Sequence, residues 1–208
     1  MRAIQVHEFG PPEVMKMKTV DDPRPGPGQV RVEVKAAGVN PVDAYIRAGM
    51  YRPDLPLPYT PGIDGAGIVD AVGFDAGELR IGRRVYFTWA ISGSYAERTL
   101  CAAANVHPLP DRIAFEQGAA LGVPYGTAYR ALFQRAHASP GETVLIHGAS
   151  GGVGLAAVQI ARAAGMRVIG SAGSEQGVEL VKSHGADCVV NHKTPGYQET
   201  IASFAGKN

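Results

Sequence analysis

The sequence lacks the features that mark several classes of protein. It has two cysteines in 208 residues, Cys101 and Cys188, and they lie far apart in the chain. So few cysteines argue against a disulfide framework and a cysteine-built metal site, and they are typical of a reducing compartment. No apolar run reaches the roughly 18 residues that a membrane-spanning helix needs. The first residues, Met1 to Gln5, are typical of a strand and not of a signal peptide. We therefore expect a cytoplasmic protein.

Charge of one sign is also missing. Lysine and arginine together number 20 and aspartate and glutamate 19, which gives a formal net charge of +1. No basic patch predicts binding to nucleic acid or to a membrane. Hydrophobic residues make up 45% of the chain, enough to build a core in one large or two small domains.

The first half of the chain is rich in glycine, proline and short strand patterns. Apolar residues at positions 30, 32, 34 and 36 alternate with charged ones, the period of a half-buried strand. Prolines between Leu55 and Gly62 exclude a helix there. The other expected strands are Arg2–Val6, Gly67–Val72, Arg84–Phe87 and Tyr95–Leu100. Many short strands with such turns predict a β-barrel-like domain over residues 1–122.

From about residue 111 the composition changes to that of helices. We expect helices at 111–121 and 126–136, with Asp111 and Thr127 as their capping residues. The second domain, residues 123–208, is expected to begin within this helical region.

A glycine-rich turn is the strongest motif of the second domain. The apolar run Val144–Ile146 precedes Gly148, Gly151 and Gly154, and an apolar helix follows as far as Gly165. Glycines at this spacing allow a tight turn, close approach of a pyrophosphate and close packing of helix on strand. The alternative is a tight turn that binds nothing. A second apolar strand at 167–170 closes a βαβ unit and favours nucleotide binding.

The chain then predicts one more helix, strand and helix. Ser174 is expected to cap a helix that Gly185 ends, Cys188–Val190 is the third strand, and a last helix starts at Pro195. Three strands make half of a sheet with the order 3-2-1-4-5-6, in which the fourth strand pairs with the first. We therefore expect Val144–Ile146 at an exposed edge, and a 208-residue chain that is marginally stable or aggregation-prone and has little activity.

Five segments in register carry a family resemblance. They are Ala37–Asp43, Pro58–Gly62, Ile91–Glu97, Gly118–Gly122 and His147–Gly154. Together they resemble the zeta-crystallin type of NADPH:quinone oxidoreductase, in the medium-chain dehydrogenase/reductase superfamily, from Met1 to about Tyr197. The resemblance implies a GroES-like β-barrel domain followed by the first, three-stranded half of a Rossmann-type parallel sheet. It also implies NADPH as cofactor and a homo-oligomer in the full-length form. Family members continue well beyond the end of this chain.

The resemblance also bears on a metal. Zinc-dependent members of the superfamily hold a catalytic zinc at positions that match Asn40, Ile63 and Val123. Catalytic zinc needs about three thiolate, imidazole or carboxylate ligands, and none of these residues supplies one. The cysteine-rich lobe of those relatives is missing, and the six histidines show no zinc-binding spacing. We therefore expect no metal.

The residue after the second strand points to NADPH as the cofactor. NAD-specific folds place Asp or Glu about 20 residues past the glycine motif, to hold the ribose 2′-hydroxyl. Ala172 stands at that place. Without a carboxylate a 2′-phosphate is not repelled, and Ser171, Ser174 and the Gly173 amide are able to bind it.

The resemblance implies a set of cofactor contacts. Those expected to touch NADPH are Tyr45, Ser150, Gly151, Gly152, Val153, Gly173 and His192, with Asn40 and Thr127 nearer the nicotinamide. Tyr45 is also the one candidate for a catalytic proton donor; its alternative is an ordinary half-buried aromatic residue.

Three functions remain open from the sequence. The first is zinc-independent reduction of a quinone by NADPH, by transfer of one electron or of two. The second is reduction of the double bond of an α,β-unsaturated carbonyl (an alkenal or enone) by the same cofactor. The third is a non-catalytic, crystallin-like protein that binds NADPH or RNA, although RNA is implied by the family alone and the net charge gives it no support.

Overall fold

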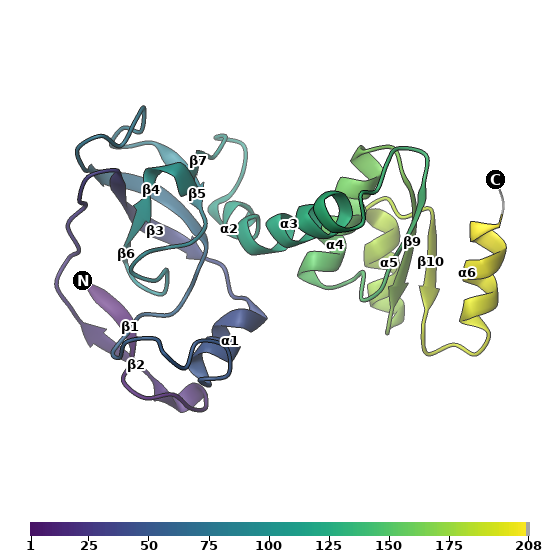
Figure 1. The fold of residues 1–208 in the computed structure, drawn as a ribbon, viewed down its shortest axis with the longest axis horizontal. Helices are drawn as coiled ribbons and strands as arrows, with labels where there is room; N and C mark the ends of the chain where they lie inside the picture. Colours follow the sequence, from purple (N-terminus) through teal and green to yellow (C-terminus); the bar gives the residue numbers. More distant parts are fainter. Residues whose placement is uncertain (207–208) are drawn as a thin grey trace. The chain divides into compact units, whose positions relative to one another are not determined.

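The computed structural model describes residues 1–206, and the chain divides after Val123 into two compact units (Figure 1). The first unit holds all residues up to Val123 and the second begins at Pro124. Each has a hydrophobic core of its own. No helix within residues 1–206 has the length and apolar character that crossing a membrane requires.

The first unit is an antiparallel β-structure. Its five-stranded sheet has the order β6 (Arg98–Ala102), β3 (Gln29–Ala37), β4 (Gly65–Val72), β5 (Arg84–Phe87), β7 (Val106–Pro108). A hairpin of β1 (Arg2–Val6) and β2 (Met15–Thr19) is tied to it by a hydrogen bond from Ile4 N–H to the Tyr95 carbonyl, 2.9 Å. This is the GroES-like domain that the sequence predicts.

The alternating pattern of β3 explains the core of this sheet. Val30 and Val32 are fully buried against Val69, Val85 and Phe87, while the charged residues between them point away. Burying a valine contributes roughly 1.5–3 kcal/mol relative to leaving it exposed, so this strand fixes which face of the sheet is inside.

Some expected elements of this unit are wrong in extent. The strand expected at 95–100 is Arg98–Ala102, and the helix expected at 111–121 is only α2 (Phe115–Ala119). Asp111 does not cap it: its side chain is almost fully exposed, beside a turn closed by Ile113 N–H and the Pro110 carbonyl. Gln117 instead accepts a hydrogen bond from Ala114 N–H at the start of α2.

The second unit is a three-stranded parallel sheet with helices. The strand order is β10 (Cys188–Asn191), β9 (Arg167–Ala172), β8 (Thr143–Ile146), with α4 (Gly152–Ala163), α5 (Glu175–Ser183) and α6 (Tyr197–Ala205). Helix α6 lies on the opposite side of the sheet from α4 and α5 (Figure 1). The three-stranded half of a Rossmann-type sheet is thus confirmed, with β8 at an edge as expected.

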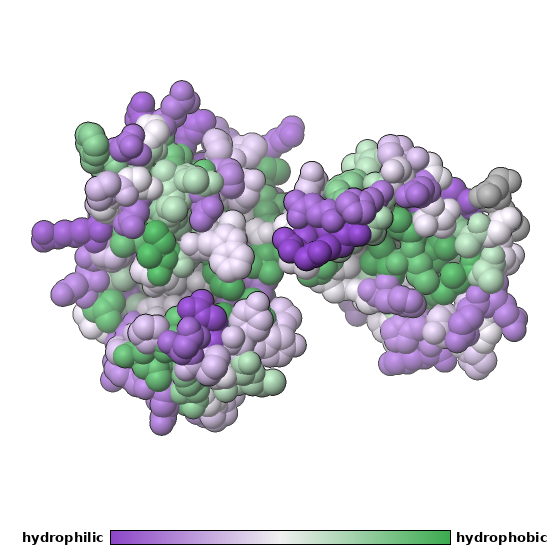
Figure 2. Space-filling model, in the orientation of Figure 1, coloured by the Kyte–Doolittle hydropathy of each residue, from purple (hydrophilic) through white to green (hydrophobic). Residues whose placement is uncertain are grey.

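Apolar side chains reach the surface of this unit. The space-filling view shows an apolar area among polar side chains (Figure 2). Leu145 of β8, Val153 of α4 and Leu180 of α5 are among its exposed large hydrophobic residues.

The helix ends of this unit test the expected caps. Ser174 caps α5 by accepting a hydrogen bond from Gly177 N–H at 3.1 Å, and Gly185 follows its end with φ +99°, so both predictions are confirmed. The helix expected at 126–136 begins earlier, as α3 (Gly122–Tyr129), and continues as the π-helical segment η3 (Arg130–Arg135). Thr127 therefore lies inside a helix and is not its cap. The last helix begins at Tyr197 and not at Pro195.

Candidate functional site

The glycine turn between β8 and α4 has the shape of an anion cradle. The ideal Cβ of an alanine at position 154 would overlap the Gly148 carbonyl oxygen and lie 2.6 Å from Ala149 Cα. Gly154 is therefore needed for the close packing of strand on helix. At Gly151 and Gly152 an ideal Cβ would lie no nearer than 3.4 Å and 3.8 Å to any other atom. Packing within the chain therefore does not require glycine at these two positions, and the missing side chains leave the turn open to a ligand.

Free N–H groups line this space. The first intrahelical hydrogen bond of α4 runs from Leu155 N–H to the Gly151 carbonyl, 2.8 Å. The N–H groups of residues 152–154 precede it and have no partner within the helix. Helix N-termini carry about half a positive charge and bind phosphate groups well. The turn can therefore hold a pyrophosphate.

A second group of residues lies where β9 and β10 end. His192 N–H donates to the Ala172 carbonyl at 2.9 Å, and the His192 ring lies against Gly173, whose ideal Cβ would be 3.0 Å from Nε2. The hydroxyls of Ser150 and Ser174 both lie 3.2 Å from the ideal Cβ of Gly177. The structure thus brings Ser150, Gly173, Ser174 and His192 together at one edge of the sheet.

Two more residues of this edge bear on the choice of cofactor. The ideal Cβ of Gly173 lies 3.6 Å from Cε of Lys193, which places a cation beside the expected 2′-phosphate site. The side-chain amide of Asn191 donates a hydrogen bond to Glu175 Oε1 at 2.8 Å. Glu175 directly follows Ser174, and this hydrogen bond holds its carboxylate. Ala172 is buried at the end of β9, and no carboxylate stands at that position.

In the first unit, the expected Asn40 lies beside two buried carboxylates. It is the N-cap of α1 (Pro41–Arg47), and its backbone N–H donates to Asp43 Oδ2 at 2.8 Å. Its side-chain amide donates to Asp64 Oδ1, also at 2.8 Å. The second oxygen of Asp64 accepts a hydrogen bond from Val123 N–H at 2.8 Å. Burial raises the pKa of Asp43 and of Asp64 above the ordinary value.

These contacts decide whether the site suits zinc. Of the three positions that match the zinc ligands of other members, Asn40 is bonded to Asp64 through its amide, and Ile63 and Val123 have apolar side chains. Val123 reaches Asp64 only through its backbone. Nowhere between residues 1 and 206 does a group of three or more His, Cys, Asp or Glu side chains come together in a way that could hold a metal ion. The residues present do not fit a catalytic zinc.

The remaining expected residues are on helices. Tyr45 lies on α1 of the first unit and is half exposed. Thr127 is exposed in α3 of the second unit. Pro124, three residues earlier on the same face of α3, has its Cγ 3.8 Å from the ideal Cβ of Gly152. Of the nine expected cofactor contacts, Asn40 and Tyr45 belong to the first unit and seven to the second.

Comparison with known proteins gives consistent matches along the chain. Residues 26–111 match the family "Alcohol dehydrogenase GroES-like domain", and residues 152–208 match "Zinc-binding dehydrogenase". The quinone oxidoreductase of Homo sapiens is 50% identical over 208 residues, and that of Rattus norvegicus 53% over 207. These alignments cover 100% and 99% of this chain but 63% of each relative, so the chain spans less than two thirds of the curated relatives' length.

Solved structures agree with these matches. The crystal structure of Escherichia coli quinone oxidoreductase complexed with NADPH has a TM-score of 0.86 at 34% identity, with 99% of this chain and 63% of that one covered. A crystal structure of an NAD-dependent alcohol dehydrogenase has a TM-score of 0.93, also at 34% identity, with 99% and 68% covered.

Proposed function

Because the chain belongs to the zeta-crystallin-type quinone oxidoreductase family of the medium-chain dehydrogenase/reductases, we propose that it binds NADPH and serves zinc-independent reduction of a quinone. The observation that carries the proposal is the edge of the second unit's sheet. At this edge an anion cradle at Gly151–Val153 lies with Gly173, Ser174 and His192, and no acid stands at position 172.

Different residues of the second unit would bind different phosphate groups of the cofactor. The N–H groups at the start of α4, with Ser150, would hold the pyrophosphate. Ser174, His192 and Lys193 would hold the 2′-phosphate. They supply a hydroxyl, an imidazole and an ammonium group close to the Gly173 backbone. These contacts favour NADPH over NADH.

The proposed reaction needs no metal ion and few catalytic groups from this chain. Bound NADPH supplies the reducing equivalents, and a quinone accepts them without a metal to polarise an alkoxide. Thr127 of the second unit would contact the nicotinamide end, and Asn40 and Tyr45 of the first unit are further contacts that the family resemblance implies. Tyr45 is half exposed, and its hydroxyl is able to give a proton to a reduced acceptor. This also keeps reduction of an α,β-unsaturated carbonyl as a second candidate.

The two cysteines bear on location. Both thiols are free, and burial raises the pKa of Cys101 to about 12, which keeps it inert. Free thiols support a reducing, cytoplasmic location. A homo-oligomer remains part of the proposal through the family.

The test is a titration of the chain with NADPH and NADH, followed by assays with an ortho-quinone, an alkenal, and an alcohol plus NADP. We expect tighter binding of NADPH, and oxidation of NADPH by the quinone in preference to the alkenal. Alcohol oxidation that a chelator abolishes would contradict the proposal. An RNA shift that weakens with salt, without turnover, would favour the non-catalytic alternative.

A further inference from the structure

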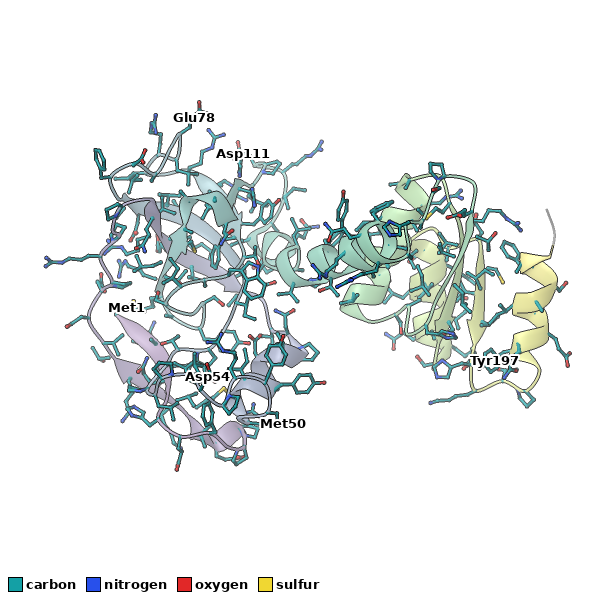
Figure 3. The ribbon with its side chains drawn as sticks, viewed as in Figure 1. Met1, Met50, Asp54, Glu78, Asp111 and Tyr197 are labelled. Atoms are coloured by element: carbon teal, nitrogen blue, oxygen red, sulfur yellow. The ribbon has the colours of Figure 1, made fainter. Side chains whose placement is uncertain are left out.

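Gly177, a buried residue in the first turn of α5, is the point where three elements of the second unit meet. An ideal Cβ at this position would lie 3.1 Å from Ala172 Cβ at the end of β9, and 3.2 Å from the Oγ atoms of Ser150 and Ser174. These distances are shorter than ordinary van der Waals contacts, so the close approach of the three elements depends on glycine. They meet at the end of the sheet from which the chain turns to Tyr197 at the start of α6 (Figure 3).

The two serine hydroxyls converge beside Gly177. Both Oγ atoms lie 3.2 Å from the same point, and a hydrogen bond from a hydroxyl to a phosphate oxygen spans about 2.7 Å. Both hydroxyls can therefore donate to oxygens of one phosphate group. Ser174 is exposed. The Ser150 hydroxyl has no hydrogen-bond partner between residues 1 and 206 and is not one of the buried unpaired atoms of that range, so solvent, and with it a ligand, reaches both serines.

The helix cap fixes one of these hydroxyls and leaves the other free to move. Ser174 Oγ accepts a hydrogen bond from Gly177 N–H at 3.1 Å, so its own hydrogen stays available to a ligand. A methyl group on residue 177 would keep that N–H in place. It would displace mainly the Ser150 hydroxyl, because Ala172 is buried in a strand and cannot move away. The place of Ser150 beside Ser174 therefore depends on glycine at position 177.

We propose that Gly177 is a positioning residue for the 2′-phosphate of NADPH: because it has no side chain, Ser150 donates a hydrogen bond to this phosphate together with Ser174. This rests on the proposed function, in which this edge of the sheet binds NADPH, and it deepens that function. Ser150 belongs to the glycine turn that borders the pyrophosphate, and through Gly177 it also takes part in the choice between NADPH and NADH.

The test is a titration of the 208-residue chain and its Gly177→Ala variant with NADPH and NADH, which differ only in the 2′-phosphate. We expect the variant to bind NADPH at least about tenfold more weakly, because a hydrogen bond to a charged phosphate is lost, and to bind NADH as the wild type does. The midpoint of urea unfolding should not fall, because alanine favours a helix more than glycine does. Gly126→Ala is the matched control: in α3 the new methyl group meets no atom within 4 Å, and both affinities should stay unchanged.

A double-mutant cycle separates positioning from packing. Ser150→Ala removes the hydroxyl without crowding the site and should weaken NADPH relative to NADH by a factor similar to that of Gly177→Ala. Adding Gly177→Ala to Ser150→Ala should then cause no further loss, because the hydroxyl through which Gly177 acts is already absent. If Gly177 served packing alone, the effects of the two substitutions on NADPH affinity would multiply.

Several results would overturn the proposal. If Gly177→Ala weakens both cofactors equally, or if the two losses multiply, Gly177 only allows α5 to pack on β9; a wild type that prefers NADPH would still support the proposed function. If the wild type binds NADPH no more tightly than NADH, the proposed function fails and the role of Gly177 fails with it. Should Gly177→Ala not fold, Ser150→Ala decides, because an unchanged preference for NADPH in that variant contradicts the proposal.

Discussion

Asp64 is a carboxylate with 1% of its surface exposed, and two hydrogen bonds fix it. The glycines around it show how tightly it is enclosed. An ideal Cβ at Gly122 would lie 2.8 Å from Asp64 Cβ, and one at Gly38 would overlap its Oδ1. Asp64 thus joins Asn40, the N-cap of α1, to Val123 at the start of α3, and both positions match zinc ligands of zinc-dependent members.

The first prediction concerns the pH dependence that Asp64 causes. Burial is the largest cause that raises its pKa above 3.8 in the folded chain. The folded state therefore holds this proton to higher pH than the unfolded state does. Its stabilising contribution is complete below pH 3.8 and is lost as pH rises through the folded pKa. The free energy of unfolding of the wild type should therefore fall, relative to that of Asp64→Asn, as pH rises from 3.8 through the folded pKa.

Urea unfolding at a series of pH values measures this difference directly. Asp54→Asn is the control, because its side chain is exposed and the substitution should leave the pH profile unchanged. If the free energy of unfolding of the wild type, relative to that of Asp64→Asn, stays constant or rises with pH, Asp64 does not have a raised pKa in the folded chain.

The second prediction separates two glycines of the same turn. Gly154→Ala places a methyl group on the Gly148 carbonyl and beside Ala149, and overpacking of this kind costs about 1–3 kcal/mol. In Gly152→Ala the new methyl group would make an ordinary van der Waals contact with Pro124 Cγ at 3.8 Å, so the substitution should not lower the free energy of unfolding. It should weaken NADPH instead, because its methyl group enters the cradle. Urea unfolding and a cofactor titration on both variants distinguish the packing role of Gly154 from the ligand-binding role of Gly152. An equal loss of stability in the two variants would contradict this distinction.

At the scale of elements, Ser174 couples the cap of α5 to the choice of cofactor. Replacing it by alanine should cost about 1 kcal/mol, the usual value of an N-cap. Aspartate caps as well as serine, but its charge would repel a 2′-phosphate beside Gly173. We therefore expect Ser174→Asp to keep the stability and to weaken NADPH about tenfold relative to NADH.

Lys193→Ala is the companion variant at this edge. It should weaken NADPH but not NADH, because it removes a cation and leaves the cap in place. If titration shows that both variants lower the affinity for the two cofactors equally, then Ser174 and Lys193 do not contact the 2′-phosphate.

The elements also show what the sequence could predict. Most strands of both units and the ends of α5 were found because their periodicity and caps are local signals, but β2 and β7 were not predicted. Helix α1 was missed, although Pro41 at its start and Asp43 three residues after Asn40 are signals of a helix start. The helix expected at 111–121 was too long because Pro110 and the turn after it hold Asp111 outside the helix.

The site was predicted unevenly for the same reason. Ser150–Val153, Gly173 and His192 follow strands in the sequence, and parallel strands bring their carboxyl ends to one edge. Asp43 and Asp64 carry no such signal, since burial depends on packing from Asn40, Tyr95 and Val123, which lie far apart in the chain.

At the scale of the whole molecule, the edge strand β8 is the feature with the largest consequence. Within residues 1–206 its partner is β9 on one side only, and Leu145 is 42% exposed on it. An exposed apolar edge with unpaired N–H and C=O groups is a template for pairing with another chain. We therefore expect the 208-residue chain to associate through β8 as its concentration rises.

Leu145→Lys tests this association, because lysine on an edge strand disfavours edge-to-edge pairing. Light scattering and sedimentation should show less association than in the wild type. Leu180→Lys is the matched control: Leu180 is 38% exposed but lies on α5, where no strand edge is available, so association should continue. If both variants suppress association equally, general surface hydrophobicity is the cause and not the edge. If neither does, the contact lies elsewhere on the chain.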